Sequence, residues 1–329
     1  MKILEGSAAC VETAGEGAGE ENAQPALPRG CLLTIGVFDG LHLGHQALLN
    51  ALQDRGHETG SETALYTFHP HPRRVLAPAD PFLCLQTQPQ FERVLASYGI
   101  DYMIREPFTP DFAALSAEEF LTEVIQNRLA PREIFVGRDF HFGKGARGSG
   151  ETLAHVGPSV GIRVTIIPQI RTGELDVSST RIRASIASGE LEDATLCLGR
   201  PYEITGKVIM GDQRGRTLGF PTANLALDSE LLPHLGVYAT QIRRLDSSDP
   251  ERLYPAVTNV GTRPTFKKGQ VLVESNLFDF DEDLYGERID VVLRRRIRQE
   301  RRFSGPDELA SQIRQDAEEA RQILAQLSA

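Results

Sequence analysis

The segment Thr34-Ile-Gly-Val-Phe-Asp-Gly-Leu-His-Leu-Gly-His45 places two histidines and several glycines at the end of an apolar run. This pattern predicts a buried strand over Leu32–Phe38, a glycine-hinged turn, and a helix that begins just after it. Glycine has no Cβ atom, so its backbone can approach a phosphate, and the N–H groups of a helix start attract anions. We therefore expect His42 and His45 to donate to a polyphosphate. A tight turn with two surface histidines is the alternative.

Length and composition limit the classes of protein that this chain can form. A chain of 329 residues favours two domains, and a net charge of −10 argues against a general nucleic-acid binder. The four cysteines (Cys10, Cys31, Cys84 and Cys197) are far apart and form no C-x-x-C pair. Neither a zinc site nor a disulfide framework is indicated, so we expect reduced thiols in a cytoplasmic protein.

The first 29 residues are rich in glutamate and small residues, and they lack both the basic start and the apolar run of a signal peptide. Burial of so few apolar groups cannot offset the conformational entropy that this segment would lose on ordering. We therefore expect 1–29 to be a disordered acidic extension. No stretch of the chain approaches the roughly 20 apolar residues of a membrane span.

Residues 30–198 alternate short apolar runs with amphipathic helical patterns, such as Phe91–Tyr98 and Ala117–Leu129. Ser116 and Glu119 form the signature of a capping box for the second helix. This alternation predicts an α/β domain with a parallel sheet, in which ligands bind at the carboxyl ends of the strands. The predicted strands are Leu32–Phe38, Ala64–Phe68, Tyr102–Arg105, Glu133–Val136 and Arg163–Ile167.

Residues 199–329 change to period-two alternation with Gly, Pro, Asp and Ser between short runs, which predicts an antiparallel β-barrel. One amphipathic helix should close the chain, with Ser304 as its cap and Asp307 completing a capping box. The basic run Arg294–Arg302 lies between a strand and this helix, where a solvated face is the simpler interpretation than a nucleic-acid site. The predicted strands are 204–210, Val237–Ile242, Tyr254–Val260, Val271–Phe278 and 289–293.

Three further segments of the first domain accompany the glycine–histidine turn. These are Thr67-Phe-His-Pro-His-Pro-Arg73, Val136-Gly-Arg-Asp-Phe-His-Phe-Gly143 and Val177-Ser-Ser-Thr-Arg-Ile-Arg183. Taken alone, the last segment could be only an N-cap cluster. Together and in this order, the segments resemble the adenylyltransferase half of the bacterial riboflavin kinase/FAD synthetases, and the turn resembles the signature of the nucleotidylyltransferase superfamily. Phe91 stands where that family usually has a lysine.

The resemblance implies that FMN attacks the α-phosphorus of ATP with a phosphate that is already ionised, so no general base is needed. His42 and His45 would then act in catalysis. The nucleotide and its phosphates would be held by a larger set: Gly36, Phe38, Asp39, Gly40, Gly44, Asp139, Ser178, Ser179, Thr180 and Arg183.

The segment Gly211-Asp-Gln-Arg-Gly-Arg-Thr-Leu-Gly-Phe-Pro-Thr-Ala-Asn224 resembles the riboflavin kinase signature of the same family. Gly211, Gly215 and Gly219 could cover phosphates with backbone N–H groups. The Thr222 hydroxyl and the Asn224 carbonyl are hard oxygen ligands that suit the Mg²⁺ of bound ATP. Turn chemistry alone is the alternative for this segment. Later segments agree with the resemblance: Gly236-Val-Tyr238, Gly261-Thr-Arg-Pro-Thr-Phe266 and Asp283-Leu-Tyr-Gly286.

Glu274, inside a predicted strand, matches the family position of a general base for the ribityl hydroxyl of riboflavin. The pattern alone, on a strand with one solvated face, more often indicates an exposed glutamate. The family usually continues with a hydrophobic residue and a histidine, where this chain has Ser275 and Asn276.

The resemblance therefore implies a bifunctional transferase that makes FMN from riboflavin and then FAD from FMN, using one ATP and Mg²⁺ at each step. Its ligands would be riboflavin, FMN, FAD and ATP, with no nucleic acid, membrane or obligate protein partner. One alternative keeps only one active half, and the other is a flavin-binding regulatory protein on the same scaffolds.

Overall fold

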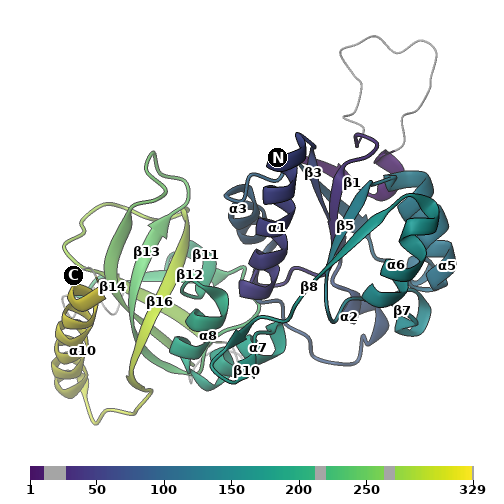
Figure 1. Cartoon of the computed structure of the whole chain (residues 1–329). Coiled ribbons are helices and arrows are strands. Elements are labelled where there is room, and N and C mark those ends of the chain that lie inside the picture. Colours follow the sequence, from purple (N-terminus) through teal and green to yellow (C-terminus); the bar gives the residue numbers. More distant parts are fainter. Residues whose placement is uncertain (11–26, 212–219, 263–270, 328–329) are drawn as a thin grey trace. The chain divides into compact units, whose positions relative to one another are not determined.

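The computed structural model describes residues 1–10, 27–211, 220–262 and 271–327 (Figure 1). The chain forms two compact units. The first contains Met1–Leu83 and Gln88–Val177, and the second contains Cys84–Thr87 and Ser178–Ala329. Residues Ser178 to Leu198 thus group with the C-terminal part of the chain, whereas the predicted division at residue 199 assigned them to the first domain. Which pieces fold separately remains a prediction.

A six-stranded sheet, parallel in every pairing, forms the centre of the first unit (Figure 1). This confirms the predicted α/β architecture. The strands lie in the order β1 (Lys2–Glu5), β4 (Tyr102–Pro107), β3 (Thr63–His69), β2 (Leu32–Ile35), β5 (Glu133–Gly137) and β8 (Arg163–Ile167). The predicted first strand is shorter than expected, since it ends at Ile35 and the next residues form a turn.

Helices cover both faces of the sheet because alternate strand residues point to opposite sides. Leu49 and Leu52 of α1 and Leu95 of α3 belong to one core, and Val124 and Leu153 belong to the other. The helical elements are α1 (Leu43–Thr59), α2 (Pro72–Leu76), α3 (Gln88–Ala96), α4 (Pro110–Ala113), α5 (Ala117–Glu119), the π-helix η3 (Phe120–Leu129) and α6 (Gly150–Val156). Short pieces complete this unit: the 3₁₀ turns η1 (Ser7–Cys10), η4 (Lys144–Ala146) and η5 (Gly157–Val160), and the pairs β6 (His141–Phe142) with β7 (Gly148–Ser149) and β9 (Arg171–Thr172) with β10 (Leu175–Asp176).

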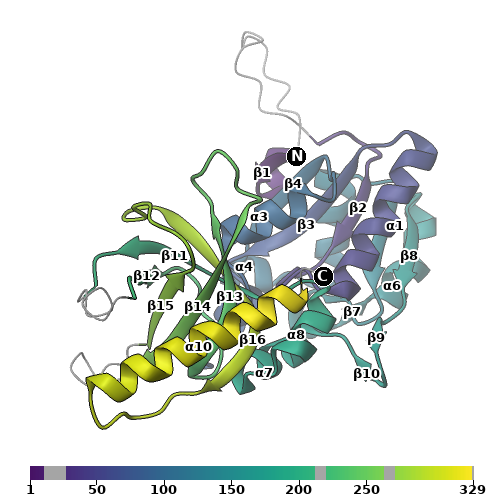
Figure 2. The same cartoon turned by 90° about the vertical axis from the view of Figure 1, so that its left-hand side faces the viewer.

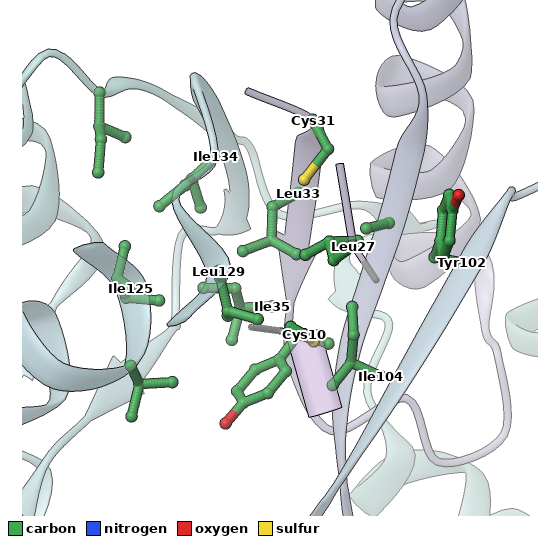
Figure 3. Packing of buried hydrophobic residues seen from close by; sticks show 14 of the residues in the cluster. Cys10, Leu27, Cys31, Leu33, Ile35, Tyr102, Ile104, Ile125, Leu129 and Ile134 are labelled. Carbon is green, nitrogen blue, oxygen red and sulfur yellow. The ribbon is translucent and has the colours of Figure 1, made fainter. Parts of the chain in front are cut away.

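The predicted disorder of 1–29 is wrong for Lys2–Cys10, which forms strand β1 and turn η1. Strand β1 pairs with β4 at the edge of the sheet, and Leu4 and Cys10 enter the core that Figure 3 shows. Burial raises the pKa of the Cys10 thiol to about 12. Residues 11–26 lie outside the described part of the chain.

The predicted helix over Ala117–Leu129 forms, with the expected capping box between Ser116 and Glu119. From Phe120 onward, however, it is a π-helix, and the N–H of Ala130 donates to the carbonyl of Ile125, five residues back. The buried residues of this helix are Phe120, Val124, Ile125 and Leu129. They recur every four to five residues, a longer period than the 3.6 residues per turn of an α-helix.

The second unit is built on a closed antiparallel barrel with the order β11 (Glu203–Ile209), β12 (Ala223–Leu227), β15 (Val271–Leu277), β14 (Leu253–Thr262), β13 (Gly236–Arg244) and β16 (Arg288–Gln299). The predicted barrel is confirmed, and β12 is a strand that the sequence did not predict. Helices α7 (Ser179–Ser188), α8 (Leu191–Leu198) and α10 (Pro306–Leu327) complete this unit.

Helix α10 lies along the outside of the barrel (Figure 2) and packs Ala320, Ile323 and Leu324 against Val237 and Val257. Its capping differs from the prediction. Ser304 donates both its backbone N–H and its hydroxyl to the carboxylate of Glu308, and Asp307 takes no part in these two bonds.

Candidate active sites

In the first unit, the residues predicted around the polyphosphate lie on the turn between β2 and α1. Gly40 and Leu41 have φ angles of 88° and 42°, in the left-handed region that is uncommon for residues other than glycine. Leu41 is fully buried, and this packing holds the unusual backbone. The turn therefore places Asp39, His42 and the first residues of α1 at the carboxyl end of β2.

His42 is the N-cap of α1, and its Nδ1 accepts a hydrogen bond from the backbone N–H of His45 at 3.4 Å. This bond assigns the proton of the neutral His42 ring to Nε2. The rings of His42 and His45 stack, with centroids 3.7 Å apart, and the Phe38 ring meets His45 edge-on at 5.1 Å. A Cβ atom at Gly44 would lie 3.1 Å from Cε1 of His42, so this close ring packing favours glycine there.

Burial and the neighbouring His42 hold the pKa of His45 well below its usual range. Within the described part of the chain, the buried Nδ1 of His45 has no hydrogen-bond partner. This lowered pKa favours the neutral form of the His45 ring, which can offer a ring N–H donor rather than a full positive charge.

Asp139 reaches the same end of the sheet because it follows β5, which pairs with β2. A Cβ atom at Gly137 would lie 3.2 Å from Oδ1 of Asp139 and 4.0 Å from Cδ1 of Leu48, on α1. Phe91, at the position where a lysine was expected, is buried in the core between the sheet and α1.

Ser178, Ser179, Thr180 and Arg183 belong to the second unit. The Ser178 side chain accepts the N–H of Arg181 at 3.2 Å and is the N-cap of α7. Arg181 pairs with Asp193 of α8, and this hydrogen bond lowers the pKa of the Asp193 carboxyl.

The predicted kinase residues gather where β12 pairs with β15. In this register Asn224 lies directly opposite Glu274, and on the other side of Glu274 lies Asn259 of β14. Opposite residues of an antiparallel pair extend to the same face of the sheet. The partly buried carboxylate of Glu274 is thus flanked by two asparagines. Asn259 was missed by the sequence analysis, since only the strand register places it here.

A cavity of about 470 Å³ opens beside this pairing. Thr222, Asn224 and Gly211 line it together with Leu277 at the end of β15. The other lining residues follow this strand: Phe280, Asp281, Glu282, Asp283, Leu284 and Tyr285. Most polar side chains in this lining carry oxygen atoms, and oxygen atoms are the ligands that a hard divalent cation prefers. Gly215 and Gly219 lie outside the described residues.

Ser275 and Asn276, which differ from the family pattern beside Glu274, both make contacts that explain their presence. Ser275 points into the barrel and continues a buried chain of hydroxyls, 2.8 Å from Thr258, which is itself 2.8 Å from Thr240. Asn276 donates from Nδ2 to the carbonyl of Pro221 at 2.7 Å.

The basic run before α10 is engaged in internal contacts. Arg294 donates to Gln241, Arg296 to the carbonyl of Leu235, and Arg298 to Asp316. The predicted solvated face is therefore only partly correct, because these three side chains make contacts within the protein.

Together, a nucleotide-binding α/β domain and a barrel with a carboxylate beside an oxygen-lined cavity define a two-domain phosphoryl-transfer protein. The family models for FAD synthetase and riboflavin kinase match residues 24–181 and 198–324. The chain belongs to the family of bifunctional riboflavin kinase/FMN adenylyltransferases. As a member of this family it converts riboflavin to FMN and FMN to FAD with ATP, as the sequence resemblance implied.

Two relatives carry that bifunctional name. The protein of Escherichia coli strain K12 is 39% identical over 305 residues, covering 93% of this chain and 96% of its own length. The protein of Bacillus subtilis is 36% identical and covers 88% of this chain and 91% of its own length. A crystal structure named as a macrolide-efflux protein from Streptococcus pneumoniae has a similar fold, with a TM-score of 0.81 and 32% identity over 90% of this chain and 95% of its own. Among the described residues, no helix is long and apolar enough to cross a membrane.

Proposed function

We propose that Glu274 is the general base of the riboflavin kinase reaction and that Thr222 and Asn224 hold the Mg²⁺ of bound ATP. The observation that carries this proposal is the register that sets Glu274 directly opposite Asn224, beside the cavity lined by Thr222. When bound, Mg²⁺ supplies charge neutralisation on the phosphates of ATP. The hydroxyl and amide oxygens of this pair suit a hard cation.

In this reaction the terminal ribityl hydroxyl oxygen of riboflavin forms a bond to the γ-phosphorus of ATP, and the bond from that phosphorus to the β-phosphate oxygen breaks. The hydroxyl proton passes to the carboxylate of Glu274, and ADP leaves. A base is useful because the hydroxyl has a pKa far above neutrality. Glu274 is only partly buried, so its carboxylate stays accessible to a substrate.

For the second reaction we propose that His42 and His45 donate to the phosphates of ATP while an FMN phosphate oxygen bonds to the α-phosphorus and pyrophosphate leaves. The assigned Nε2–H of His42 and the partnerless Nδ1 of His45 support donor roles toward an anion. Gly36, Phe38, Asp39, Gly40, Gly44 and Asp139 would surround this nucleotide. Ser178, Ser179, Thr180 and Arg183 are proposed as phosphate-binding residues on sequence grounds.

We further propose a cytoplasmic enzyme that needs no nucleic acid, membrane or obligate protein partner. The four cysteines are far apart in the sequence, and three arginines of the basic run contact groups of the protein itself. Gly211 would contribute its backbone to the ATP phosphates beside the cavity that it lines. Gly215 and Gly219 are proposed for the same task on sequence grounds.

The test compares the full-length wild type with Glu274→Gln, using riboflavin, ATP and Mg²⁺ and separating FMN from FAD by chromatography. The amide is nearly isosteric but cannot accept the proton. We expect kcat for FMN formation to fall by about 10²–10⁴-fold with KM roughly held. FAD formation from supplied FMN should persist. A Glu274→Gln enzyme with near-normal kinase turnover would show that Glu274 is only a surface strand residue. Wild type that makes FMN but no FAD, or the reverse, would favour the single-activity alternative.

A further inference from the structure

The segment Pro221–Asn224 lies half inside and half outside the barrel's hydrogen-bonded ladder. The pairing of β12 with β15 begins at Ala223, opposite Ser275, and continues to Asn224, opposite Glu274. Pro221 and Thr222 precede the first paired residue, so no ladder bond of β12 holds them. Something other than strand pairing must fix the peptide that carries the Thr222 hydroxyl.

Asn276 supplies this connection. It is two residues from Glu274 on β15, so the two side chains extend to the same face of the strand. Its Nδ2 donates to the carbonyl oxygen of Pro221 at 2.7 Å, a good length for such a bond. A side chain thereby continues the connection between β15 and the β12 segment beyond the last ladder pair.

Asn224, at the other end of this segment, is also packed. Nδ2 of Asn224 lies 3.5 Å from the carbonyl oxygen of Thr222. A Cβ atom at Gly211 would lie 2.5–2.6 Å from the amide atoms of Asn224, so the Gly211 backbone packs directly on that amide. Gly211 therefore packs on Asn224, and Asn276 holds the Pro221 carbonyl that precedes Thr222.

We propose that Asn276 is a positioning residue for the ATP–metal segment: its amide holds the Pro221 carbonyl so that the oxygens of Thr222 and Asn224 keep a fixed place relative to Glu274. Strand β15 then carries the proposed base and also fixes the proposed metal ligands. It thereby sets the distance between the Glu274 carboxylate and the bound ATP–metal complex. This inference rests on the proposed function of Thr222, Asn224 and Glu274.

Three full-length variants test the role. Asn276→Asp keeps the size but replaces the donor with an acceptor that repels the Pro221 carbonyl. Asn276→His restores a ring N–H donor and is the rescue variant. Asn127→Asp makes the same chemical change on an exposed residue of η3 and is the matched control. Urea unfolding of each variant reports whether the fold is intact.

The first readout is hydrogen–deuterium exchange of peptides that cover residues 220–227, measured at increasing MgADP concentrations. The MgADP concentration at half-maximal protection reports binding at this segment. Losing the bond and gaining a repulsion is worth about 1.4 kcal/mol or more, so we expect the Asn276→Asp midpoint to rise at least roughly tenfold. Asn276→His and Asn127→Asp should stay within about threefold of wild type. ADP without Mg²⁺ should discriminate the variants less.

The second readout is the kinase reaction. Asn276→Asp should raise KM for MgATP by a similar factor, with the KM for riboflavin little changed. An unchanged MgADP midpoint and an unchanged KM for MgATP in Asn276→Asp would overturn the inference, as would an Asn276→His variant as impaired as Asn276→Asp. A wild type that forms no FMN would instead refute the proposed function, so the two failures are distinguishable.

Discussion

At the scale of single residues, the turn between β2 and α1 combines a cap, a ring stack and a glycine that makes room for both. The His42 ring folds back over the first turn of α1 because its Nδ1 accepts the His45 N–H. Gly44 lies beneath that ring, and a side chain there would press on it. Ring position and helix start are thus determined by the same few atoms.

We predict opposing effects for Gly44→Ala. Alanine is favoured in a helix over glycine by about 0.5–1 kcal/mol, which offsets the cost of the tight 3.1 Å contact with His42 and leaves stability nearly unchanged. The displaced ring should nevertheless slow FAD formation from FMN by roughly ten- to a hundredfold. FMN formation by the same variant should be normal. Asn50→Ala, on the exposed side of α1, is the control, and FAD formation as fast as in the control would contradict the proposed role of His42.

At the scale of elements, helix α10 is held on the barrel by apolar packing and by one shielded ion pair. Nε and Nη2 of Arg298, on β16, donate to the two carboxylate oxygens of Asp316 at 2.8 and 2.7 Å, and Asp316 is only 3% exposed. Gln312 adds a third bond to the same carboxylate at 2.7 Å. The pair therefore joins α10 to β16 at a defined residue, in addition to the apolar contacts.

Arg298→Ala should destabilise the barrel because it leaves the Asp316 carboxylate buried without its cation. Breaking a buried pair costs about 3–5 kcal/mol, and partial exposure of Arg298 reduces our expectation to about 2–3 kcal/mol. Arg321 is also on α10, and its ion pair with Asp279 is exposed. Arg321→Ala should therefore lower the free energy of unfolding by less than about 1 kcal/mol. Urea unfolding followed by circular dichroism measures both. An equal loss of unfolding free energy in the two variants would mean that the burial of the Asp316 pair does not contribute to stability.

At the scale of the whole chain, helix α7, which has Ser178 as its N-cap and carries Arg183, belongs to the same compact unit as the barrel. Helix α8 belongs to this unit too. Glu192 of α8 lies 3.6 Å from Arg295 of β16, and a Cβ atom at Gly189 would lie 3.1 Å from Nη1 of Arg296. A piece of chain that begins at residue 200 lacks these contacts.

We therefore expect two fragments to differ. Residues 178–329 should fold and convert riboflavin to FMN without making FAD. Residues 200–329 should retain the kinase activity but unfold at a lower urea concentration, because β16 loses its contacts with α8 and with Gly189. Denaturation midpoints and FMN yields of both fragments test this. The division of labour is wrong if residues 178–329 fold without kinase activity while the full chain is active; equal midpoints would show that α7 and α8 do not stabilise the barrel.

The sequence by itself determined the class of each unit, the residues of the β2–α1 turn and most strands. These features are local, because a glycine–histidine turn, an apolar run or a period-two alternation spans about ten residues and predicts the structure of those residues alone. The closing helix and the capping box at Ser116 were predictable for the same reason.

Only the tertiary structure decided which distant segments meet. Strand β1 is ordered because β4, about a hundred residues later, offers an edge to which it can bond. Asn259 becomes a neighbour of Glu274, and Asn276 a partner of Pro221, only through the barrel register. Pairing between strands depends on long-range contacts that no single short pattern contains, because every exposed strand edge offers the same backbone donors and acceptors.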